Sequence, residues 1–492
     1  MTILENVLTK REMTFADLEC EREDVLNWDK MKKTADLFGL NILVQRKVTN
    51  IGVLYDPDVD GAFSGYIVED FLSRAGISKR NIYRMMNKNK VHGYSKAVKD
   101  WVLSNNIELL IIPDAGSSNA LEIHTELPDL HCLILDHHEY TPADLPTDTK
   151  VTVLNVSDDE NLPALSGCGV AFRFIEMVGR KFGIETDLYM PYVGITVLSD
   201  LCSMKDKENR FYVSKAYDNY HVNKFLEAFP FYGSYKTFFN FQVSPYLNAL
   251  IRCGEEDKMM NIVNSMDDPI VTSGIRSDIA RVKGEQQNRM SDMFNMGQLK
   301  ELKGCVVHIR HEGKEHKSLN GLLANKLLSV HSCSALVLRL NKEKRVWEGS
   351  FRGKFSNTIL KEWGFDARGH DKACGITVEH EKLLDFINRF EYVAGATPKT
   401  PDAVLDAHDF TVEEALDIAR FNEYASSDIE PIYVEFTNKA EEYNIIPSNK
   451  RVYLKVADIQ IVDFAVEPVT DNVLAEPALQ NDVLGFQLAR RY

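Results

Sequence analysis

The stretch Cys132-Leu133-Ile134-Leu135-Asp136-His137-His138 places a short apolar run directly before three side chains that can hold protons or metal ions. Two earlier runs have the same form, because residues 51–55 lead into Asp56 and residues 109–113 lead into Asp114. Short apolar runs separated by helix-like stretches predict buried parallel strands of βαβ units. Such sheets bind ligands just beyond the carboxyl ends of their strands. We therefore expect the three acidic loops to face one crevice.

Further carboxylates follow the apolar runs at close spacing. Three stand at alternate positions after residue 55, closed by Gly61, and another ends the apolar segment 192–199. With the second loop, the set is Asp56, Asp58, Asp60, Asp114 and Asp200. Carboxylates crowded into one crevice raise one another's pKa values unless cations neutralise them. The set therefore predicts a metal site.

The ligand types indicate which metal and which chemistry. Carboxylate oxygens with imidazole favour Mn²⁺ or Mg²⁺, whereas structural zinc sites use closely spaced cysteine and histidine, and the sequence has no C-x-x-C pair. Two ions about 3.5–4 Å apart could activate a water and hold both the attacking and the leaving oxygen of a phosphoester. The predicted reaction is hydrolysis at phosphorus.

Each motif taken alone has a plainer interpretation. A lone D-x-D-x-D-G is usually a solvated turn or a calcium loop, but an EF-hand needs glutamate at loop position 12, where this chain has Ile67. His137 or His138 alone would be a core histidine more often than a ligand, and Asp200 alone a helix cap. Their joint occurrence favours the metal site.

The order of these motifs resembles the DHH phosphoesterase superfamily, and finer details resemble its RecJ-like single-strand exonucleases. His92-Gly93-Tyr94 is similar to the G-Y-G element of that family, and Glu208-Asn209-Arg210 is similar to its E-N-R element. Asn155 followed by residues 165–172 resembles its N-P and L-A-G-x-G-V-A-F pair, with Val156 in place of the proline.

A second lobe is indicated from about residue 305. Residues 369–375 resemble the G-G-H-x-x-A-A-G motif of the DHH-associated domain, DHHA1, and Ser350-Phe351-Arg352 resembles its upstream S-x-R. Glycines let the main chain approach a phosphate closely, and an arginine can hold that phosphate through two hydrogen bonds. An ordinary glycine-containing turn is the plain alternative.

The resemblance implies a role for each matching residue. Two ions, Mn²⁺ or Mg²⁺, would be held by Asp56, Asp58, Asp60, Asp114, His137 and Asp200. Asp136 and His138 would be catalytic, with Asp136 orienting the His137 ring and His138 contacting a substrate phosphate. Further substrate contacts would come from Arg252, Ser350, Arg352, Gly369 and His370.

The expected fold is α/β, with a parallel-sheet DHH domain joined by a long helix to a smaller α/β DHHA1 domain and followed by a C-terminal α+β segment. The expected divisions are an N-terminal extension (1–45), the DHH catalytic domain (46–270), the connecting helix (271–303), the DHHA1 substrate-binding domain (304–398) and an acidic, OB-like C-terminal segment (399–492). Thr411 followed by two glutamates predicts a helix start within that last segment.

The net charge of −16 is unusual for a protein that binds nucleic acid, because such binding relies on lysine and arginine. Residues 401–492 hold 18 Asp and Glu against 7 Lys and Arg, so −11 lies there and −5 on the first 400 residues. We expect a protein partner at this acidic segment, although a solvated acidic surface explains it equally well. Scattered cysteines and the lack of a signal peptide or membrane-length apolar stretch predict a cytoplasmic protein.

The resemblance implies a 5′–3′ exonuclease that hydrolyses single-stranded DNA in repair or recombination. Two alternatives stay open: a DHH enzyme that degrades oligoribonucleotides or cyclic dinucleotides, and a catalytically silent scaffold for replication or repair. The choice between DNA and RNA and the polarity of cleavage are left open by the sequence.

Overall fold

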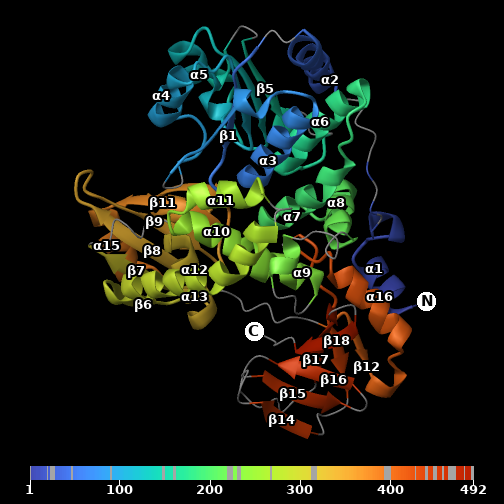
Figure 1. Ribbon diagram of the computed structural model, residues 1–492. Coiled ribbons are helices and arrows are strands. Elements are labelled where there is room, and N and C mark those ends of the chain that lie inside the picture. The colour runs from blue at the N-terminus through green and yellow to red at the C-terminus, as the bar shows by residue number, and fades with distance from the viewer. Residues whose placement is uncertain are drawn as a thin grey trace. The chain divides into compact units, whose positions relative to one another are not determined.

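A five-stranded parallel sheet carries the acidic loops, and its strands lie in the order β2-β1-β3-β4-β5 (Figure 1). Their bounds are β1 Ile51–Tyr55, β2 Ile82–Met86, β3 Leu109–Pro113, β4 His131–Asp136 and β5 Val151–Asn155. Every neighbouring pair in this sheet is parallel. All residues of β1 and β3 are buried, as continuous apolar runs predict. The predicted α/β class with a parallel sheet is confirmed.

The computed structural model describes residues 2–18, 20, 22, 28–45, 48–88, 91–146, 150–158, 162–218, 225–229, 234–265, 269–311, 319–392, 401–426, 428–437, 442–446, 451–456, 459–463, 473–480 and 483–488. They belong to two compact units. Unit 1 comprises Met1–Ser277 and Pro398–Tyr492, and unit 2 comprises Asp278–Thr397.

Helices cover both faces of the parallel sheet. On one face, α4 (Lys96–Ser104) and α5 (Ala120–Glu126) share one apolar core with the strands. On the other, α3 (Val59–Arg74) and α6 (Gly167–Phe182) pack against β1, β3, β4 and each other (Figure 1). Both of these longer helices begin at the edge of the sheet that carries the acidic loops.

A helical layer follows in the chain. Its members are α7 Met190–Ser199, α8 Lys207–Asp218, α9 Tyr235–Phe238, α10 Ser244–Arg252 and α11 Glu256–Val263. The apolar segment that ends in Asp200 is thus a helix, buried along residues 190–198 and packed on α8.

The connecting helix expected over 271–303 corresponds to α12, Pro269–Asn295, and β6 (Gln298–Leu302) follows it directly. The turn between them needs Gly297, because a Cβ there would lie 2.3 Å from Cε1 of His308. Unit 2 begins within α12.

Unit 2 holds a six-stranded sheet in the order β10-β11-β9-β8-β7-β6, in which only β7 and β8 pair in parallel. Its other elements are β7 Cys305–Arg310, α13 Asn320–His331, β8 Ser334–Asn341, β9 Val346–Arg352, α14 Asn357–Glu362, β10 Asp366–His370, β11 Ala373–Glu379 and α15 His380–Arg389. Two apolar clusters, one on each side of the sheet, form its core.

The C-terminal part of unit 1 holds a seven-stranded sheet in the order β12-β13-β17-β18-β16-β15-β14. Its elements are β12 Ala403–Leu405, α16 Val412–Asn422, β13 Val434–Phe436, β14 Glu442–Ile446, β15 Arg451–Val456, β16 Ile459–Asp463, β17 Val473–Gln480 and β18 Val483–Leu488. Thr411 caps α16 through a capping box with Glu414, so the predicted helix start is confirmed.

The N-terminal helix contacts the C-terminal part of unit 1. The first helix, α1 (Ile3–Lys10), packs against α16, whereas α2 (Asp29–Phe38) packs on α6. Just after α1, Arg11 donates from Nε and Nη2 to Oδ1 of Asp402, at 3.1 and 2.8 Å. Among the described residues, no helix is both long and apolar enough to cross a membrane.

Candidate metal centre

The three acidic loops lie side by side at one edge of the parallel sheet. Asp56 directly follows β1, Asp114 directly follows β3, and Asp136 is the last residue of β4. Because β3 lies between β1 and β4, the Asp114 turn is flanked by the other two. The Asp114 N–H donates to the carbonyl of Leu135 at 2.8 Å, which fixes this turn to the end of β4. The structure thus brings together the loops that the sequence placed in one crevice.

The first loop is held by two helix N-termini. Asp58 caps α3, and its carboxylate accepts from the N–H of Gly61 at 3.0 Å. Asp60 is buried and accepts from the N–H groups of Gly167 and Cys168, at 2.7 and 2.9 Å, at the start of α6. The partial positive charge of a helix N-terminus stabilises such a carboxylate.

Asp114 carries buried oxygens that nothing in the described chain satisfies. Its φ of +67° lies in the left-handed region, which residues with a side chain rarely adopt. The side chain is 1% exposed, and neither carboxylate oxygen has a hydrogen-bond partner among the described residues. Buried acceptors without donors are costly, so this carboxylate is placed for a ligand that the chain does not supply.

His137 lies at the centre of the carboxylates. Its Nε2 is 3.1 Å from Oδ1 of Asp114, 3.6 Å from Oδ2 of Asp200 and 3.8 Å from Oδ2 of Asp60. Asp200 reaches this point from the C-terminal end of α7. The Nε2 atom is buried and, within the described part of the chain, accepts or donates no hydrogen bond. Burial lowers the pKa of His137, which favours the neutral imidazole that a metal requires.

A second group of possible ligands includes a histidine that the sequence analysis did not assign. Nδ1 of His92 lies 2.6 Å from Oδ2 of Asp56, and the N–H of Gly93 donates to Oδ1 of Asp56 at 3.3 Å. His92, Asp56 and Asp58 present oxygen and nitrogen atoms within 4.8 Å of one another. The H-G-Y motif marked this loop, but the motif alone did not indicate that its histidine reaches the first acidic loop.

Asp136 does not orient the ring of His137, and this expectation was wrong. Its carboxylate accepts from Nδ1 of His138 at 2.9 Å, whereas its contact with His137 is to the main-chain N–H at 2.8 Å. The reason is that the His137 ring points to Asp114, leaving the ring of the next residue to face Asp136. The N–H of Ser117 donates to the other carboxylate oxygen at 3.0 Å.

The Asp136–His138 contact is an ion pair at neutral pH. Burial alone would raise the pKa of Asp136, but hydrogen bonds from His138 and Ser117 lower it to about 2. The hydrogen bond to Asp136 raises the pKa of His138 to about 9. The rim of the acidic cluster therefore carries an imidazolium that could contact an anion.

The other carboxylates are destabilised as anions. Burial raises the pKa of Asp56, Asp60 and Asp114, and neighbouring carboxylates add to the effect at each of them. Burial, with Asp60 and Asp58 nearby, raises the pKa of Asp200 to about 8. Divalent cations would relieve this repulsion. Oxygen-rich donors with one or two imidazoles suit Mn²⁺ or Mg²⁺, so these residues fit the expected metals.

The other residues predicted to contact substrate lie on α10 of unit 1 and on strands β9 and β10 of unit 2. Arg252 is the last residue of α10 in unit 1. In unit 2, Ser350 and Arg352 lie on β9, and Gly369 and His370 lie on β10. Both strands pair with β11, where Arg352 and His370 are each in register with Ala373. Burial lowers the pKa of Arg352. The side chain of His370 lies outside what the structure describes.

The part of the chain that carries the acidic loops matches a known protein family. Residues 50–198 match the model of the DHH family, N-terminal domain. The loops after β1, β3 and β4 lie within the part of the chain that matches this family.

Two curated relatives indicate what kind of DHH protein this chain resembles. YorK of Bacillus subtilis (strain 168), named provisionally as an SPbeta prophage-derived single-strand DNA-specific exonuclease, is 26% identical over 432 residues, covering 78% of this chain and 72% of YorK. The single-stranded-DNA-specific exonuclease RecJ of the same strain is 24% identical over 454 residues, covering 85% of this chain and 56% of RecJ. The predicted resemblance to RecJ-like exonucleases is confirmed.

Solved structures show the same fold. RecJ from Thermus thermophilus in complex with Mn²⁺ aligns with 99% of this chain and 75% of its own, at a TM-score of 0.74 and 17% identity. An exonuclease RecJ bound to manganese aligns with 75% of this chain and 97% of its own, at a TM-score of 0.57 and 18% identity.

Proposed function

We propose that this chain is a metal-dependent phosphodiesterase that degrades single-stranded DNA from the 5′ end with two Mn²⁺ or Mg²⁺ ions. The observation that carries the proposal is the convergence of Asp60, Asp114 and Asp200 on Nε2 of His137, where neither this nitrogen nor the oxygens of Asp114 have a hydrogen-bond partner among the described residues. The names of the relatives support the substrate class.

Three groups of side chains lie close enough together to hold an ion: Asp60, His137 and Asp200; Asp114, His137 and His138; and Asp56, Asp58 and His92. The first two share His137, so they would hold one ion and the third group would hold the other. Asp114 lies against His137 and is close enough to serve the first group. Bound ions would supply an activated water and stabilise the charge that develops on the phosphoryl oxygens.

The chain's own residues would hold the substrate. The imidazolium of His138, kept charged by Asp136, would donate to a phosphate oxygen. Further proposed phosphate contacts are Arg252 in unit 1 and, in unit 2, Ser350, Arg352, Gly369 and His370. A protein partner for the acidic C-terminal segment remains part of the proposal.

The test is cleavage of end-labelled single strands, long and short, with and without a 5′ phosphate, in Mn²⁺. Asp114→Asn should abolish cleavage, because it removes a buried charge that faces His137. Asp129→Asn is the matched control, since Asp129 is fully exposed just before β4, at the opposite end of that strand from the cluster. It should cleave as the wild type does.

Each outcome selects one hypothesis. Stepwise loss of long strands from the 5′ end, absent in Asp114→Asn, supports the proposal. Cleavage of short oligomers or cyclic dinucleotides alone would replace it with the oligonucleotide branch of the family. Wild-type protein that binds Mn²⁺ without cleaving any strand would favour a scaffold.

A further inference from the structure

The loop that carries Asp200 adopts a strained conformation. Leu201, directly after Asp200, has a φ of +56° and is 72% exposed. A non-glycine residue in the left-handed region costs about 1–2 kcal/mol, and exposure means that burial of the leucine does not offset this. Such a conformation persists only where the surrounding contacts determine it.

Contacts from α8 hold the carbonyl groups of this loop, residues 201–206. Nδ2 of Asn209 donates to the carbonyl of Ser203 at 2.9 Å. Nη1 of Arg210 donates to the carbonyls of Met204 and Lys205, the latter at 2.9 Å. Within the loop, the N–H of Cys202 donates to the carbonyl of Val197 at 3.1 Å, and the hydroxyl of Ser203 and the N–H of Met204 face a partner from elsewhere in the chain.

That partner comes from the C-terminal part of the chain. Asp428 accepts from the hydroxyl of Ser203 and, at 3.3 Å, from the N–H of Met204. Burial raises its pKa, but hydrogen bonds from Ser203 and Ser426 lower the value overall, so Asp428 is an anion at neutral pH. Its turn is closed by Ser426, whose N–H donates to the carbonyl of Ile429 at 2.8 Å.

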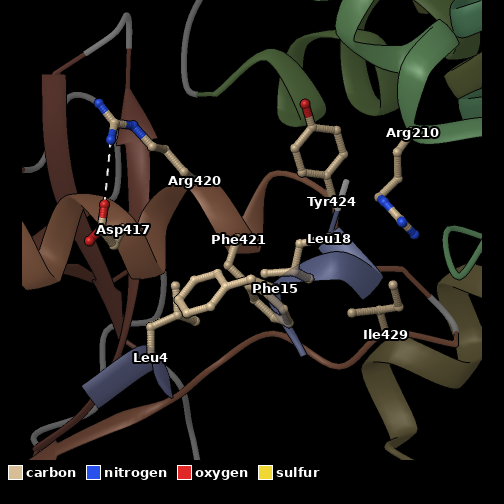
Figure 2. Close-up of a pocket in the computed structure, with 9 residues that line it drawn as sticks. All are labelled: Leu4, Phe15, Leu18, Arg210, Asp417, Arg420, Phe421, Tyr424 and Ile429. Carbon is tan, nitrogen blue, oxygen red and sulfur yellow. Dashed lines mark hydrogen bonds and ion pairs between the residues drawn. The ribbon is translucent and has the colours of Figure 1, made fainter. Parts of the chain in front are cut away.

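Side chains do not fill all the space near the contact of Asp428 with Ser203 and Met204. A cavity of about 270 Å³ lies between the first helices, α8 and the end of α16, and Arg210 and Ile429 are in its wall (Figure 2). Its other lining residues are Leu4, Phe15, Leu18, Asp417, Arg420, Phe421 and Tyr424. Arg210 thus links the wall of this cavity to the carbonyls of Met204 and Lys205.

We propose that Asp428 is a positioning residue for Asp200: by anchoring residues 203 and 204, it fixes the loop next to this ligand and strengthens cation binding by the acidic cluster. The inference rests on the proposed metal site and extends it to a segment outside the DHH domain. Removing a group that does not touch the metal but orients one of its ligands typically weakens metal binding by about 10- to 100-fold. Because Asp428 acts through the loop, we expect a loss near the lower end of that range.

The experiment is calorimetric titration of Mn²⁺ into the full chain, with no substrate present, for wild type, Asp428→Asn and Ser203→Ala. Both variants should weaken Mn²⁺ binding about tenfold. Ser203→Ala keeps the charge of Asp428, so an effect there shows positioning rather than the loss of a nearby anion. The double variant should bind no more weakly than either single one, because the two residues form one contact.

Asp402→Asn is the matched control. Asp402 also joins the C-terminal part of unit 1 to the rest, through Arg11, and also accepts from a main-chain N–H, that of Tyr433. It should lower the unfolding temperature of the metal-free protein as much as Asp428→Asn does, yet leave Mn²⁺ affinity unchanged.

Normal Mn²⁺ affinity in Asp428→Asn and Ser203→Ala would overturn the inference while leaving the metal site intact. An equal loss of Mn²⁺ affinity in Asp402→Asn would also overturn the inference. Weaker packing of the C-terminal part of unit 1 against the rest of that unit would then explain the loss. Wild-type protein that binds no Mn²⁺ would refute the metal site and this inference together.

Discussion

The anionic forms of Asp200 and Asp114 are less stable in the metal-free protein than they would be in water. Both are surrounded by other carboxylates, and burial is the largest cause of their raised pKa values. In the metal-free protein the folded state therefore takes up protons that the unfolded chain does not bind. A carboxylate with a raised folded-state pKa makes the fold less stable as the pH rises.

This gives a pH dependence that one substitution should reduce. In the presence of a chelator, the unfolding temperature of the wild type should rise as the pH falls from about 9 to about 6, the range around the pKa of about 8 for Asp200. Asp200→Asn should be more stable than the wild type at the alkaline end, by roughly 2–4 °C for each kcal/mol of repulsion removed, and its pH profile should be flatter. Thermal unfolding followed by circular dichroism measures both.

The exposed Asp129 again provides the control, because Asp129→Asn should keep the wild-type pH profile. A profile for Asp200→Asn as steep as that of the wild type would show that the carboxylate at position 200 is not the source. Saturating Mn²⁺ should reduce the difference between pH values in the wild type, leaving the part that comes from the His138–Asp136 pair.

At the scale of elements, the start of α6 touches two acidic loops at once. The N–H of Gly167 donates to Asp60, and a Cβ on Gly167 would lie 2.3 Å from Oδ1 of Asp114 and 2.6 Å from its Cα. The helix can therefore approach the turn after β3 only with glycine at this position. The geometry of the cluster depends on this helix packing as much as on the ligands themselves.

Gly167→Ala should therefore displace Asp114 and weaken Mn²⁺ binding. Overpacking of this kind costs about 1–3 kcal/mol of stability. Gly274→Ala in α12 is the matched control, because a Cβ added there would have no atom of the described chain within 4 Å, and alanine should stabilise that helix by about 0.5–1 kcal/mol. Chemical denaturation and Mn²⁺ titration of both variants test this. Wild-type affinity in Gly167→Ala would contradict it.

The arrangement of the strands and loops explains which features could be predicted from the sequence. Asp56, Asp114 and Asp136 were placed together because apolar runs predict parallel strands, whose carboxyl ends share one edge. The partner of Asp136 was missed because it depends on which way two adjacent histidine rings turn, and sequence spacing does not determine that. His92 was missed as a possible ligand because its approach to Asp56 depends on the path of the loop after β2.

Contacts between residues far apart in the chain could not be predicted from the sequence, for a different reason. Ser203 and Asp428 are 225 residues apart, and neither stands in a motif that indicates a partner. Their contact follows from how the segment after α16 packs against the 201–206 loop. The predicted domain boundaries likewise did not indicate that unit 1 draws on both ends of the chain.

At the scale of the whole molecule, unit 2 is inserted between the two parts of unit 1. It has its own sheet and its own apolar clusters, which include the buried Trp347 and Phe351. A segment with a complete core of this kind should fold alone.

Residues 278–397, expressed alone, should therefore unfold in one cooperative transition. For about 120 residues the heat-capacity change should be about 1.4–1.8 kcal/mol/K, which scanning calorimetry measures. The fluorescence of buried Trp347 should change in the same transition, and Trp347→Phe identifies its contribution. A gradual change in either signal would show that unit 2 needs the rest of the chain.

The insertion also sets an order of events during translation. The 225 residues between Ser203 and Asp428 take roughly 10–45 s to synthesise at roughly 5–20 residues per second. Unit 2, residues 278–397, is synthesised within that interval, so near its end the nascent polypeptide holds the acidic cluster and all of unit 2 but still lacks Asp428, which anchors residues 203 and 204. On the proposal made above, a newborn chain would hold Mn²⁺ about tenfold more weakly than the finished protein until residue 428 has been added.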